Sequence, residues 1–332
     1  MRVSLVDSAE TFECRQGETL LRAALKAGYA APYECASGTC GSCKARLIKG
    51  TVDTRWQGAT GLSDRDRRKG DRILCCQSIP TSDCIIRLRA ESDNKEPAPE
   101  RYVAEVSGIM ELCCGVRRLI LTSDRAIPFL PGQFVLFDMG SEIGFRAYSM
   151  ANPSDGAECM EFFVKEKSGG AATGIIFDQL KLGDQLKLEG PYGRGYLRTN
   201  GVRPIVAVAG GSGLAPMLSI VRSALRLGAR RSVQLFFGVN CVDELFCWPE
   251  LLDLKREYED FELTIALRDG PIQDPNGILR IGMVGDLMLS SRSDLMDCDL
   301  YLAGPPGMVD SLIAQTIGQN KIPADRVFFD RF

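Results

Sequence analysis

Three cysteines near the N-terminus have the spacing of an iron–sulfur site. Cys35, Cys40 and Cys43 follow one another as C-x4-C-x2-C, the spacing of three of the four thiolates that hold a plant-type [2Fe–2S] cluster. Gly38 and Gly41 lie between them, and residues without a Cβ permit the positive φ angles that turn backbone N–H groups toward inorganic sulfide. The sequence therefore predicts a one-electron carrier in this part of the chain, with a fourth cysteine still to be found.

Two adjacent cysteines, Cys75 and Cys76, can supply the fourth thiolate. They lie in a short apolar segment, residues 72–77, that is expected to return to the loop as a strand. The segment resembles the Leu-x-Cys-Gln sequence at the end of the cluster motif in oxygenase-linked ferredoxin domains. In that register the resemblance implies that Cys76 is the ligand and that Cys75 replaces a small buried residue.

Structural zinc and disulfides are the alternatives for these cysteines. Zinc sites prefer two CxxC or HxxxH pairs, whereas here one CxxC faces two adjacent cysteines, whose sulfurs do not easily reach one tetrahedral ion. Disulfides are disfavoured because 13 cysteines is an odd number and no secretory segment opens the chain, which indicates a reducing cytoplasm. With no histidine, a Rieske cluster and a His-based triad are excluded from this chain, so its chemistry must belong to cofactors.

Length and composition indicate a multidomain globular protein. A chain of 332 residues predicts two or three domains, and 45% hydrophobic with 25% charged residues is ordinary for a soluble protein. No apolar run approaches the 18 residues of a membrane span, and neither a membrane nor a nucleic acid is expected as a partner. The formal charge of −3 hides an asymmetry, since residues 1–95 carry +4 and the remainder −7.

The first domain is predicted to cover residues 1–92. Alternating apolar residues predict a first strand pair, a helix is expected from about Glu18 to Ala27 with Gly28 placed to end it, and residues 45–48 and 85–88 indicate further strands. By resemblance, the cluster motif implies the β-grasp fold for this arrangement. Residues 93–100 are polar and contain prolines, and we expect them to form a semi-rigid linker.

Residues 101–199 are dominated by short strands and resemble the flavin barrel of the ferredoxin–NADP reductase superfamily. The motif Arg146-Ala147-Tyr148-Ser149 provides a ring to stack, a hydroxyl to bond a ring nitrogen and a guanidinium for phosphate. The resemblance implies an antiparallel β-barrel that binds FAD. It also implies that Tyr148 and Ser149 are catalytic, with Tyr148 over the isoalloxazine and Ser149 near N5, while Arg146 binds the pyrophosphate.

The same resemblance implies three further cofactor-binding residues in this region. Gly170 and Thr173 precede an apolar segment that is predicted to be a helix, and a helix N-terminus with small residues suits an anion. Thr173 is assigned to the FAD pyrophosphate. Lys165, at the end of a predicted strand, is included in the cofactor site.

From residue 200 to residue 332 the pattern changes to that of a doubly wound α/β domain. The apolar run 205–209 predicts a strand buried on both faces, and it leads directly into a glycine-rich turn. Gly211 and Gly213 let the backbone approach a pyrophosphate, and Pro216 suits the first turn of the next helix. Pro216 at the end of the motif is also what the nicotinamide domain of the reductase superfamily shows. Asp243, beyond the second strand, favours NADH over NADPH because a carboxylate repels a 2′-phosphate.

The end of the chain carries two more features. Residues 303–306 resemble the superfamily's Cys-Gly-Pro-Pro turn, which implies that Gly304 and Pro305 lie beside the nicotinamide, with Ala303 in place of the cysteine. The chain ends in aromatic residues, and Phe332 is predicted to pack on the flavin. For Phe328 and Phe329 the alternative is a last buried strand.

Over its whole length the sequence resembles the reductase component of a bacterial multicomponent aromatic oxygenase. The resemblance implies a cytoplasmic, NADH-dependent iron–sulfur flavoprotein that passes electrons from NADH through FAD and the [2Fe–2S] cluster to a partner. That partner is an oxygenase hydroxylase component or an intermediate ferredoxin, a Rieske-type one included, and the reductase is expected to be a monomer that docks transiently. A reductase for a deoxysugar dehydrase and a non-enzymatic zinc or redox-sensing protein are the alternatives.

Overall fold

The computed structural model of the protein describes residues 1–6, 10–88, 96–154, 156, 158–228, 231–270, 274, 276–319 and 321–332. Part of the expected linker, residues 93–95, lies outside them. The chain forms two compact units. Unit 1 comprises residues 1–103, 134–147 and 186–193, and unit 2 comprises residues 104–133, 148–185 and 194–332.

The N-terminal part of unit 1 is a mixed sheet with one packed helix. The sheet has the strand order β2-β1-β7-β3-β5, in which β1 and β7 are parallel and the other pairs antiparallel, and β4 pairs with β6 apart from it. This arrangement confirms the predicted β-grasp layout. Its elements are β1 (Arg2–Leu5), β2 (Thr11–Glu13), α1 (Leu20–Lys26), β3 (Lys44–Lys49), β4 (Val52–Thr54), α2 (Asp64–Lys69), β5 (Arg72–Leu74), β6 (Ser78–Pro80) and β7 (Cys84–Arg87).

Helix α1 forms where its sequence predicts. The Thr19 hydroxyl accepts a hydrogen bond from the backbone N–H of Arg22, which caps the first turn. Leu21, Ala24 and the other apolar residues of the helix are buried in the core of unit 1. The helix ends at Lys26 with Ala27 as its C-cap, and Gly28 follows with a φ of +78°, as expected of the residue that stops the helix.

The other strands of unit 1 come from the predicted flavin region. They are β10 (Phe134–Asp138), the first residues of β11 (Phe145–Ser149) and most of β13 (Gln185–Tyr192). Strands β10 and β13 pair antiparallel. Phe134, Phe145 and Tyr192 belong to the same apolar cluster as the residues of α1. Unit 1 therefore contains a core shared by the cluster-bearing fold and these strands.

A buried carboxylate lies in this shared part of unit 1. Glu189, whose side chain is 2% exposed, lies 3.2 Å from Arg55, 3.2 Å from Arg101 and 3.9 Å from Arg22, and it accepts a 2.8 Å hydrogen bond from Tyr192. Burial alone would raise the pKa of Glu189, but the Arg55 guanidinium and its neighbours hold that pKa below its ordinary value. Burial and the adjacent carboxylate raise the pKa of Tyr192. Glu189 is thus a fixed negative charge that joins four distant segments.

Unit 2 begins with antiparallel strands. Strand β9 pairs with β8 on one side and with β12 on the other, and a single bridge joins Met150 to Phe162. The antiparallel sheet of the flavin region is therefore confirmed, while closure into a barrel stays a prediction. The elements are β8 (Glu100–Cys113), β9 (Val116–Ser123), β12 (Cys159–Lys165), α3 (Ala171–Gly174) and a π-helical turn, η1 (Ile175–Gln179).

The rest of unit 2 is a parallel sheet with helices on both faces. Its strand order is β17-β16-β15-β14-β18-β19, and every neighbouring pair is parallel. The elements are β14 (Ile205–Gly210), η2 (Gly211–Gly213), α4 (Leu214–Arg226), β15 (Val233–Val239), η3 (Val242–Glu244), α5 (Trp248–Glu257), β16 (Phe261–Leu267), β17 (Leu279–Ile281), α6 (Val284–Ser291), η4 (Leu295–Asp297), β18 (Asp299–Gly304), α7 (Pro306–Thr316), η5 (Ala324–Arg326) and β19 (Val327–Arg331).

Strand β14 explains why the sheet is doubly wound. Its alternate residues face opposite ways: Ala207 packs in one cluster with α4 and α5, and Val208 packs in another with α6 and α7. All six residues of β14 are buried, as the continuous apolar run predicts. The predicted α/β domain is confirmed. None of the helices that the structure describes is long and apolar enough to cross a membrane.

We expect Glu189→Gln to destabilise unit 1. Removing one partner of a buried ion pair leaves uncompensated charge, which costs about 3–5 kcal/mol. Urea unfolding at pH 7 should show a lower midpoint for the transition of this unit. Asp253→Asn is the control, because Asp253 pairs with Arg256 on an exposed helix surface and should change stability by about 0.5 kcal/mol or less.

The pH dependence of this effect follows from the lowered pKa of Glu189. A carboxylate with a depressed folded-state pKa stabilises the protein above its unfolded pKa, near 4.5, and loses that contribution as the pH falls through the lower folded value. The difference between wild type and Glu189→Gln should therefore shrink below about pH 4.5. Equal midpoints for both proteins at pH 7 would show that the carboxylate does not hold these segments together.

Candidate cofactor sites

The cluster loop packs closely against a second turn at Gly61, and the space between the two backbones is too small for a side chain. Gly41 has a φ of +80°, and a Cβ added to it would lie 2.7 Å from the carbonyl oxygen of Gly61. Gly61 in turn donates its N–H to the carbonyl of Gly38 at 2.9 Å. The two glycines of the motif are therefore required both for the left-handed backbone and for this close approach.

Hydrogen-bond donors surround the expected ligand sulfurs. The Cys35 sulfur accepts from the backbone N–H groups of Thr39 and Cys40, both at 3.4 Å, and the Cys40 sulfur accepts from Ser42 at 3.4 Å. The Gln77 amide donates to Cys76 at 3.6 Å. Such donors stabilise thiolates and tune the reduction potential of a cluster, so the surroundings fit an iron–sulfur group.

The four predicted ligands group into two sulfur pairs. The thiol of Cys40 donates to Cys35, which lowers the pKa of Cys35 to about 4 and raises that of Cys40. The thiol of Cys76 donates in the same way to Cys43, and this bond together with burial raises the pKa of Cys76. Two pairs suit two irons with two thiolates each. Among the described residues, no three or more His, Cys, Asp or Glu side chains are grouped so that they could hold a metal ion, and this applies to the four predicted ligands as well.

Cys75 differs from Cys76 in its contacts. It is fully buried in the core of unit 1, and its backbone N–H donates to the carbonyl of Cys43 at 3.0 Å. Burial raises the pKa of its thiol, with only a further electrostatic contribution from Cys43. The structure thus gives Cys75 the surroundings of a core residue.

In the flavin motif, Arg146 lies on β11 against an aromatic ring. Its guanidinium carbon is 4.7 Å from the centroid of the Trp56 ring, and one of its N–H groups donates to the carbonyl of Phe145 at 2.9 Å. Among the described residues Arg146 makes no other side-chain hydrogen bond, so most of its five donors are available to a phosphate. This side chain fits the expected anion.

Ser149 and Tyr148 end the same strand in unit 2. The Ser149 hydroxyl is mostly buried and donates to Asp330 at 3.3 Å, and Tyr148 is half-buried. Asp330 lies on β19 opposite Ala303 of β18. The hydroxyl predicted to meet the flavin is therefore oriented by a carboxylate from the C-terminal strand.

The Gly170–Thr173 turn forms as predicted, but its hydroxyl is already engaged. Thr173 Oγ1 accepts from the Lys167 N–H at 3.2 Å and donates to the Gly170 carbonyl at 3.1 Å. It closes the turn that begins α3, and its expected bond to pyrophosphate stays a prediction. Lys165 forms a 3.5 Å ion pair with Glu244.

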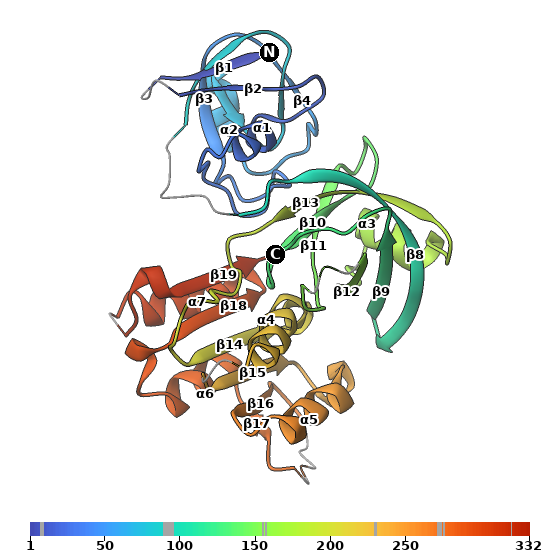
Figure 1. The fold of residues 1–332 in the computed structure, drawn as a ribbon, viewed down its shortest axis with the longest axis vertical. Helices are drawn as coiled ribbons and strands as arrows, with labels where there is room; N and C mark the ends of the chain where they lie inside the picture. Colours follow the sequence, from blue (N-terminus) through green and yellow to red (C-terminus); the bar gives the residue numbers. More distant parts are fainter. Residues whose placement is uncertain are drawn as a thin grey trace. The chain divides into compact units, whose positions relative to one another are not determined.

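The glycine turn after β14 lies where the sheet reverses its winding order. The chain proceeds from β14 outward to β15, β16 and β17, and then returns to β18 on the other side of β14 (Figure 1). Ligands of such sheets bind at this switch point. Gly213 is required there, because a Cβ would lie 2.2 Å from the Ala303 carbonyl oxygen. Gly211 has a φ of +54° and open space around it, and Pro216 lies in the first turn of α4, so the turn fits a phosphate.

The C-terminal residues meet the second turn at this switch point. Phe332 donates its N–H to the Gly304 carbonyl at 3.3 Å, and its side chain is 49% exposed. Gly304 is followed by Pro305 and the start of α7. Phe328 lies in β19 and stacks on Tyr301 with ring centroids 4.9 Å apart, so Phe328 and Phe329 form a last strand in which both are half-buried, and their packing on the flavin stays a prediction.

Beyond β15, the carboxylate of Glu244 forms a hydrogen bond and an ion pair, whereas that of Asp243 is exposed. Glu244 accepts from the Asn240 amide at 2.9 Å and pairs with Lys165. Asp243 is exposed, which suits the ribose role expected of it.

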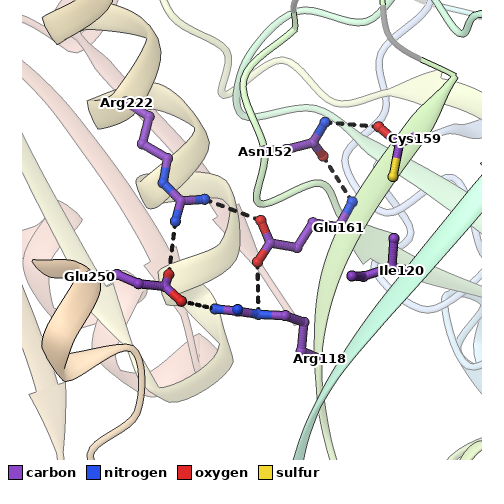
Figure 2. A pocket seen from close by; sticks show the side chains of 7 residues that line it. All are labelled: Arg118, Ile120, Asn152, Cys159, Glu161, Arg222 and Glu250. Carbon is purple, nitrogen blue, oxygen red and sulfur yellow. Dashed lines mark hydrogen bonds and ion pairs between the residues drawn. The ribbon is translucent and has the colours of Figure 1, made fainter. Parts of the chain in front are cut away.

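A four-membered charge ring, which has no sequence motif, lines a pocket of about 400 Å³ in unit 2 (Figure 2). Arg118 lies 2.9 Å from Glu161 and also pairs with Glu250, while Arg222 lies 3.1 Å from Glu161 and 2.8 Å from Glu250. The ring links β9 and β12 to α4 and α5. The predicted cofactor residues are not among its lining residues.

Sequence reasoning missed three contributors to these sites: Asp330, Trp56 and Glu189. Trp56 is one of only two tryptophans, and Asp330 is the acidic residue among the C-terminal aromatics. These features could have drawn attention to Trp56 and Asp330, but they do not indicate which residues these side chains contact. Glu189 has no such feature in the sequence.

Three domain families match the chain in the predicted order. Residues 4–81 match the 2Fe-2S iron-sulfur cluster binding domain, residues 105–196 the oxidoreductase FAD-binding domain, and residues 207–313 the oxidoreductase NAD-binding domain. These matches confirm the three predicted cofactors. The domain boundaries at residues 92, 101 and 199 stay predictions.

Relatives match over nearly the whole chain. The ferredoxin–NAD(+) reductase component of the alkene monooxygenase system of Xanthobacter autotrophicus is 51% identical over 98% of this chain and 99% of its own. The phenol 2-monooxygenase reductase component of Pseudomonas sp. is 33% identical, with coverages of 99% and 94%. A solved ferredoxin reductase of carbazole 1,9a-dioxygenase has a TM-score of 0.86, 31% identity and coverages of 100% and 98%.

The fold and the matched domains define an iron–sulfur flavoprotein oxidoreductase of the NAD-dependent class. More narrowly, the chain belongs to the family of reductase components of multicomponent oxygenase systems.

We expect Cys76→Ser to lose the cluster and Cys75→Ser to retain it. The Cys76 sulfur is paired with Cys43 and bonded by Gln77, whereas Cys75 has core surroundings. Iron content and visible absorption of the two purified variants test this assignment. A stable cluster in Cys76→Ser together with its loss in Cys75→Ser would reverse it.

Proposed function

We propose that this chain transfers electrons from NADH to an oxygenase or an intermediate ferredoxin, in the order NADH, FAD, [2Fe–2S], partner. When bound, the flavin converts a two-electron donor into single electrons and the cluster carries them one at a time. The observation that carries the last step, from cluster to partner, is the unequal exposure of the cluster loop: Cys43 and Cys76 are buried, whereas Thr39 and Cys40 are exposed. An exposed edge on an otherwise buried site suits delivery to another protein.

The proposed roles of the residues follow from their positions. Ser149, held by Asp330, orients the flavin for hydride arrival, and Tyr148 covers the ring. Losing one well-placed catalytic hydrogen bond costs about 10²–10³ in rate, which is the scale assigned to Ser149. Arg146 binds the pyrophosphate with its free N–H groups. Gly170, Thr173 and Lys165 are assigned to the same cofactor by sequence resemblance alone.

For the nicotinamide nucleotide we propose a site at the switch point of the parallel sheet. Gly211, Gly213 and Pro216 bind its phosphates, and Gly304 and Pro305 lie at the nicotinamide end. We place Phe332 at this end too, because its backbone N–H donates to the carbonyl of Gly304. Asp243 takes the ribose hydroxyls, which favours NADH because a 2′-phosphate would meet a carboxylate.

We propose that the partner belongs to a hydrocarbon-oxidising system. The expectation from the sequence is an aromatic substrate, and the phenol and carbazole systems of two relatives are of that kind. The relative that is 51% identical serves an alkene monooxygenase, which favours an alkene over an aromatic compound. The hydrocarbon itself is bound by the partner rather than by this chain.

The cluster-bearing part presents a basic helix to such a partner. In α2, Arg65, Arg68 and Lys69 are exposed, and no ion pair engages them within the part of the chain that the structure describes. Arg67 differs, because its guanidinium donates to the carbonyl of Ala59 beside the cluster loop. The proposed docking surface therefore consists of Arg65, Arg68 and Lys69, and Arg67 has a structural contact instead.

The order of electron transfer is tested with Cys76→Ser. If flavin and cluster act in series, this variant should keep its NADH–ferricyanide activity and lose electron transfer from NADH to cytochrome c, which accepts single electrons from the cluster. Cys75→Ser is the control and should keep both activities. Loss of both activities in Cys76→Ser, with normal FAD content, would contradict the series order.

Docking is tested by reversing two charges in the last turn of α2. Arg68→Glu with Lys69→Glu should lower the rate of electron delivery to the native partner about tenfold at low ionic strength, because long-range fields steer encounter. The deficit should shrink toward 0.1 M salt and above, where the screening length falls to about 10 Å.

The matched control reverses Lys255 and Arg256, two exposed cations in the last turn of α5. It changes the net charge equally and should leave delivery unchanged. NADH–ferricyanide activity should be normal in both double variants. Equal rates for the α2 and α5 variants at every salt concentration would place the docking surface elsewhere.

A further inference from the structure

Two pairs of neighbouring residues interleave within unit 1. Arg55 and Trp56 come from the cluster-bearing fold, and Phe145 and Arg146 come from β11. The guanidinium carbon of Arg55 lies 3.3 Å from the Phe145 ring centroid, and that of Arg146 lies 4.7 Å from the Trp56 centroid. Each pair thus offers one cation and one ring to the other, and both contacts are within the range of cation–π attraction.

The Trp56 ring occupies a narrow slot between two glycines. A Cβ added to Gly58 would lie 2.7 Å from the indole Nε1, and one added to Gly144 would lie 3.2 Å from Cγ. The Gly144 backbone has a φ of +76°, which favours glycine independently. The chain therefore leaves space for a large ring at this position, and the ring orientation is fixed by backbone on both sides.

The segment that carries Trp56 continues to the cluster loop. The Ala59 N–H donates to the Trp56 carbonyl at 3.3 Å, and the methyl group of Ala59 would be 3.1 Å from a Cβ on Gly38. Arg67 bonds the carbonyl of Ala59 from α2. Ala59, three residues after Trp56 in the sequence, thus lies against the loop of the expected ligands.

Arg55 is anchored by the buried carboxylate. It lies 3.2 Å from Glu189, and its side chain is 12% exposed. Because Glu189 also engages Arg22 and Arg101, the backbone at residues 55 and 56 is held from several segments of unit 1. Trp56 is therefore a rigid support rather than a mobile surface ring.

A guanidinium that stacks by its face keeps its N–H groups free at its edge. The guanidinium carbon of Arg146 lies over the Trp56 ring, and one N–H donates to the carbonyl of Phe145. Arginine binds phosphate through its in-plane N–H groups, so contact with the ring and phosphate binding are compatible. A supported guanidinium loses less side-chain entropy when its ligand binds.

We propose that Trp56, a residue of the cluster-bearing domain, is a positioning residue of the flavin site that holds Arg146 for the FAD pyrophosphate. The proposal rests on the role of Arg146 in the proposed function. The consequence is a coupling between two modules, because flavin affinity then depends on a side chain of the iron–sulfur domain. By reciprocity, bound flavin strengthens the contact between Trp56 and Arg146 by the same factor.

The test is a flavin titration of the full chain with its cluster retained and its FAD removed. Trp56→Leu should weaken FAD binding about tenfold, as the loss of one partly desolvated cation–π contact predicts. Trp56→Phe keeps a ring and should restore most of the affinity. Riboflavin, which has no phosphate, is the second ligand, and its affinity should be equal in wild type and in both variants.

Arg146→Gln distinguishes failure of this inference from failure of the proposed site. If Arg146→Gln leaves FAD affinity unchanged, the role of Arg146 in the proposed function is wrong. If it weakens FAD binding while Trp56→Leu does not, only the inference is overturned. The double variant should bind FAD no more weakly than Arg146→Gln alone, because both substitutions remove one coupled interaction.

Structural damage would give a different pattern. Equal weakening of FAD and riboflavin in Trp56→Leu, with a lower melting temperature than Trp56→Phe, would overturn the proposal, since a general loss of packing does not select for phosphate. Trp248→Phe is the control for aromatic substitution, because Trp248 begins α5 in unit 2. It should leave the affinity for both flavins unchanged.

Discussion

Carboxylates that each bind several arginines, one buried and one partly buried, hold the segments of each unit together. In unit 1, Glu189 engages Arg22, Arg55 and Arg101, and in unit 2, Glu161 engages Arg118 and Arg222. An isolated buried charge is expensive, so Glu189 tolerates its position only while its partners are in place, and the same cost applies in smaller measure to the partly buried Glu161. The two networks therefore act as geometric constraints: segments that are far apart in the sequence must meet in one arrangement before the charges are satisfied.

Such networks contribute more to specificity than to net stability. Desolvating two ions costs about as much as their attraction returns, and an apolar contact of the same volume would often be at least as stable. What an apolar contact lacks is direction, because it permits sliding. The charge ring of Figure 2 fixes α4 and α5 against β9 and β12 through four paired side chains, so these elements cannot shift by one turn without leaving charges unpaired.

Local features of the fold and the sites could be predicted from the sequence, and distant pairings could not. The cysteine spacing, the glycines at 38 and 41 and the apolar run of β14 act over a few residues, so their physical causes are visible in the sequence. Glu189 bonds Arg55 and Arg101 from 134 and 88 positions away, and charge pairing has no periodicity that a sequence displays. Thr173 shows a related limit: the residue type indicates a phosphate ligand, but only the structure reveals that its hydroxyl closes a turn.

Each network lies beside a residue that is expected to meet a cofactor, and this proximity gives the networks a functional meaning. In unit 1, Arg55 bonds Glu189 and stacks on Phe145, the neighbour of Arg146. In unit 2, Arg222 of the ring also donates to the carbonyl of Ala151, two residues beyond Ser149, and lies on the helix that begins at the glycine turn. A change in either network should therefore shift a residue that is expected to face a cofactor. Substitutions in these networks should then change cofactor binding and electron transfer at temperatures where the fold remains intact.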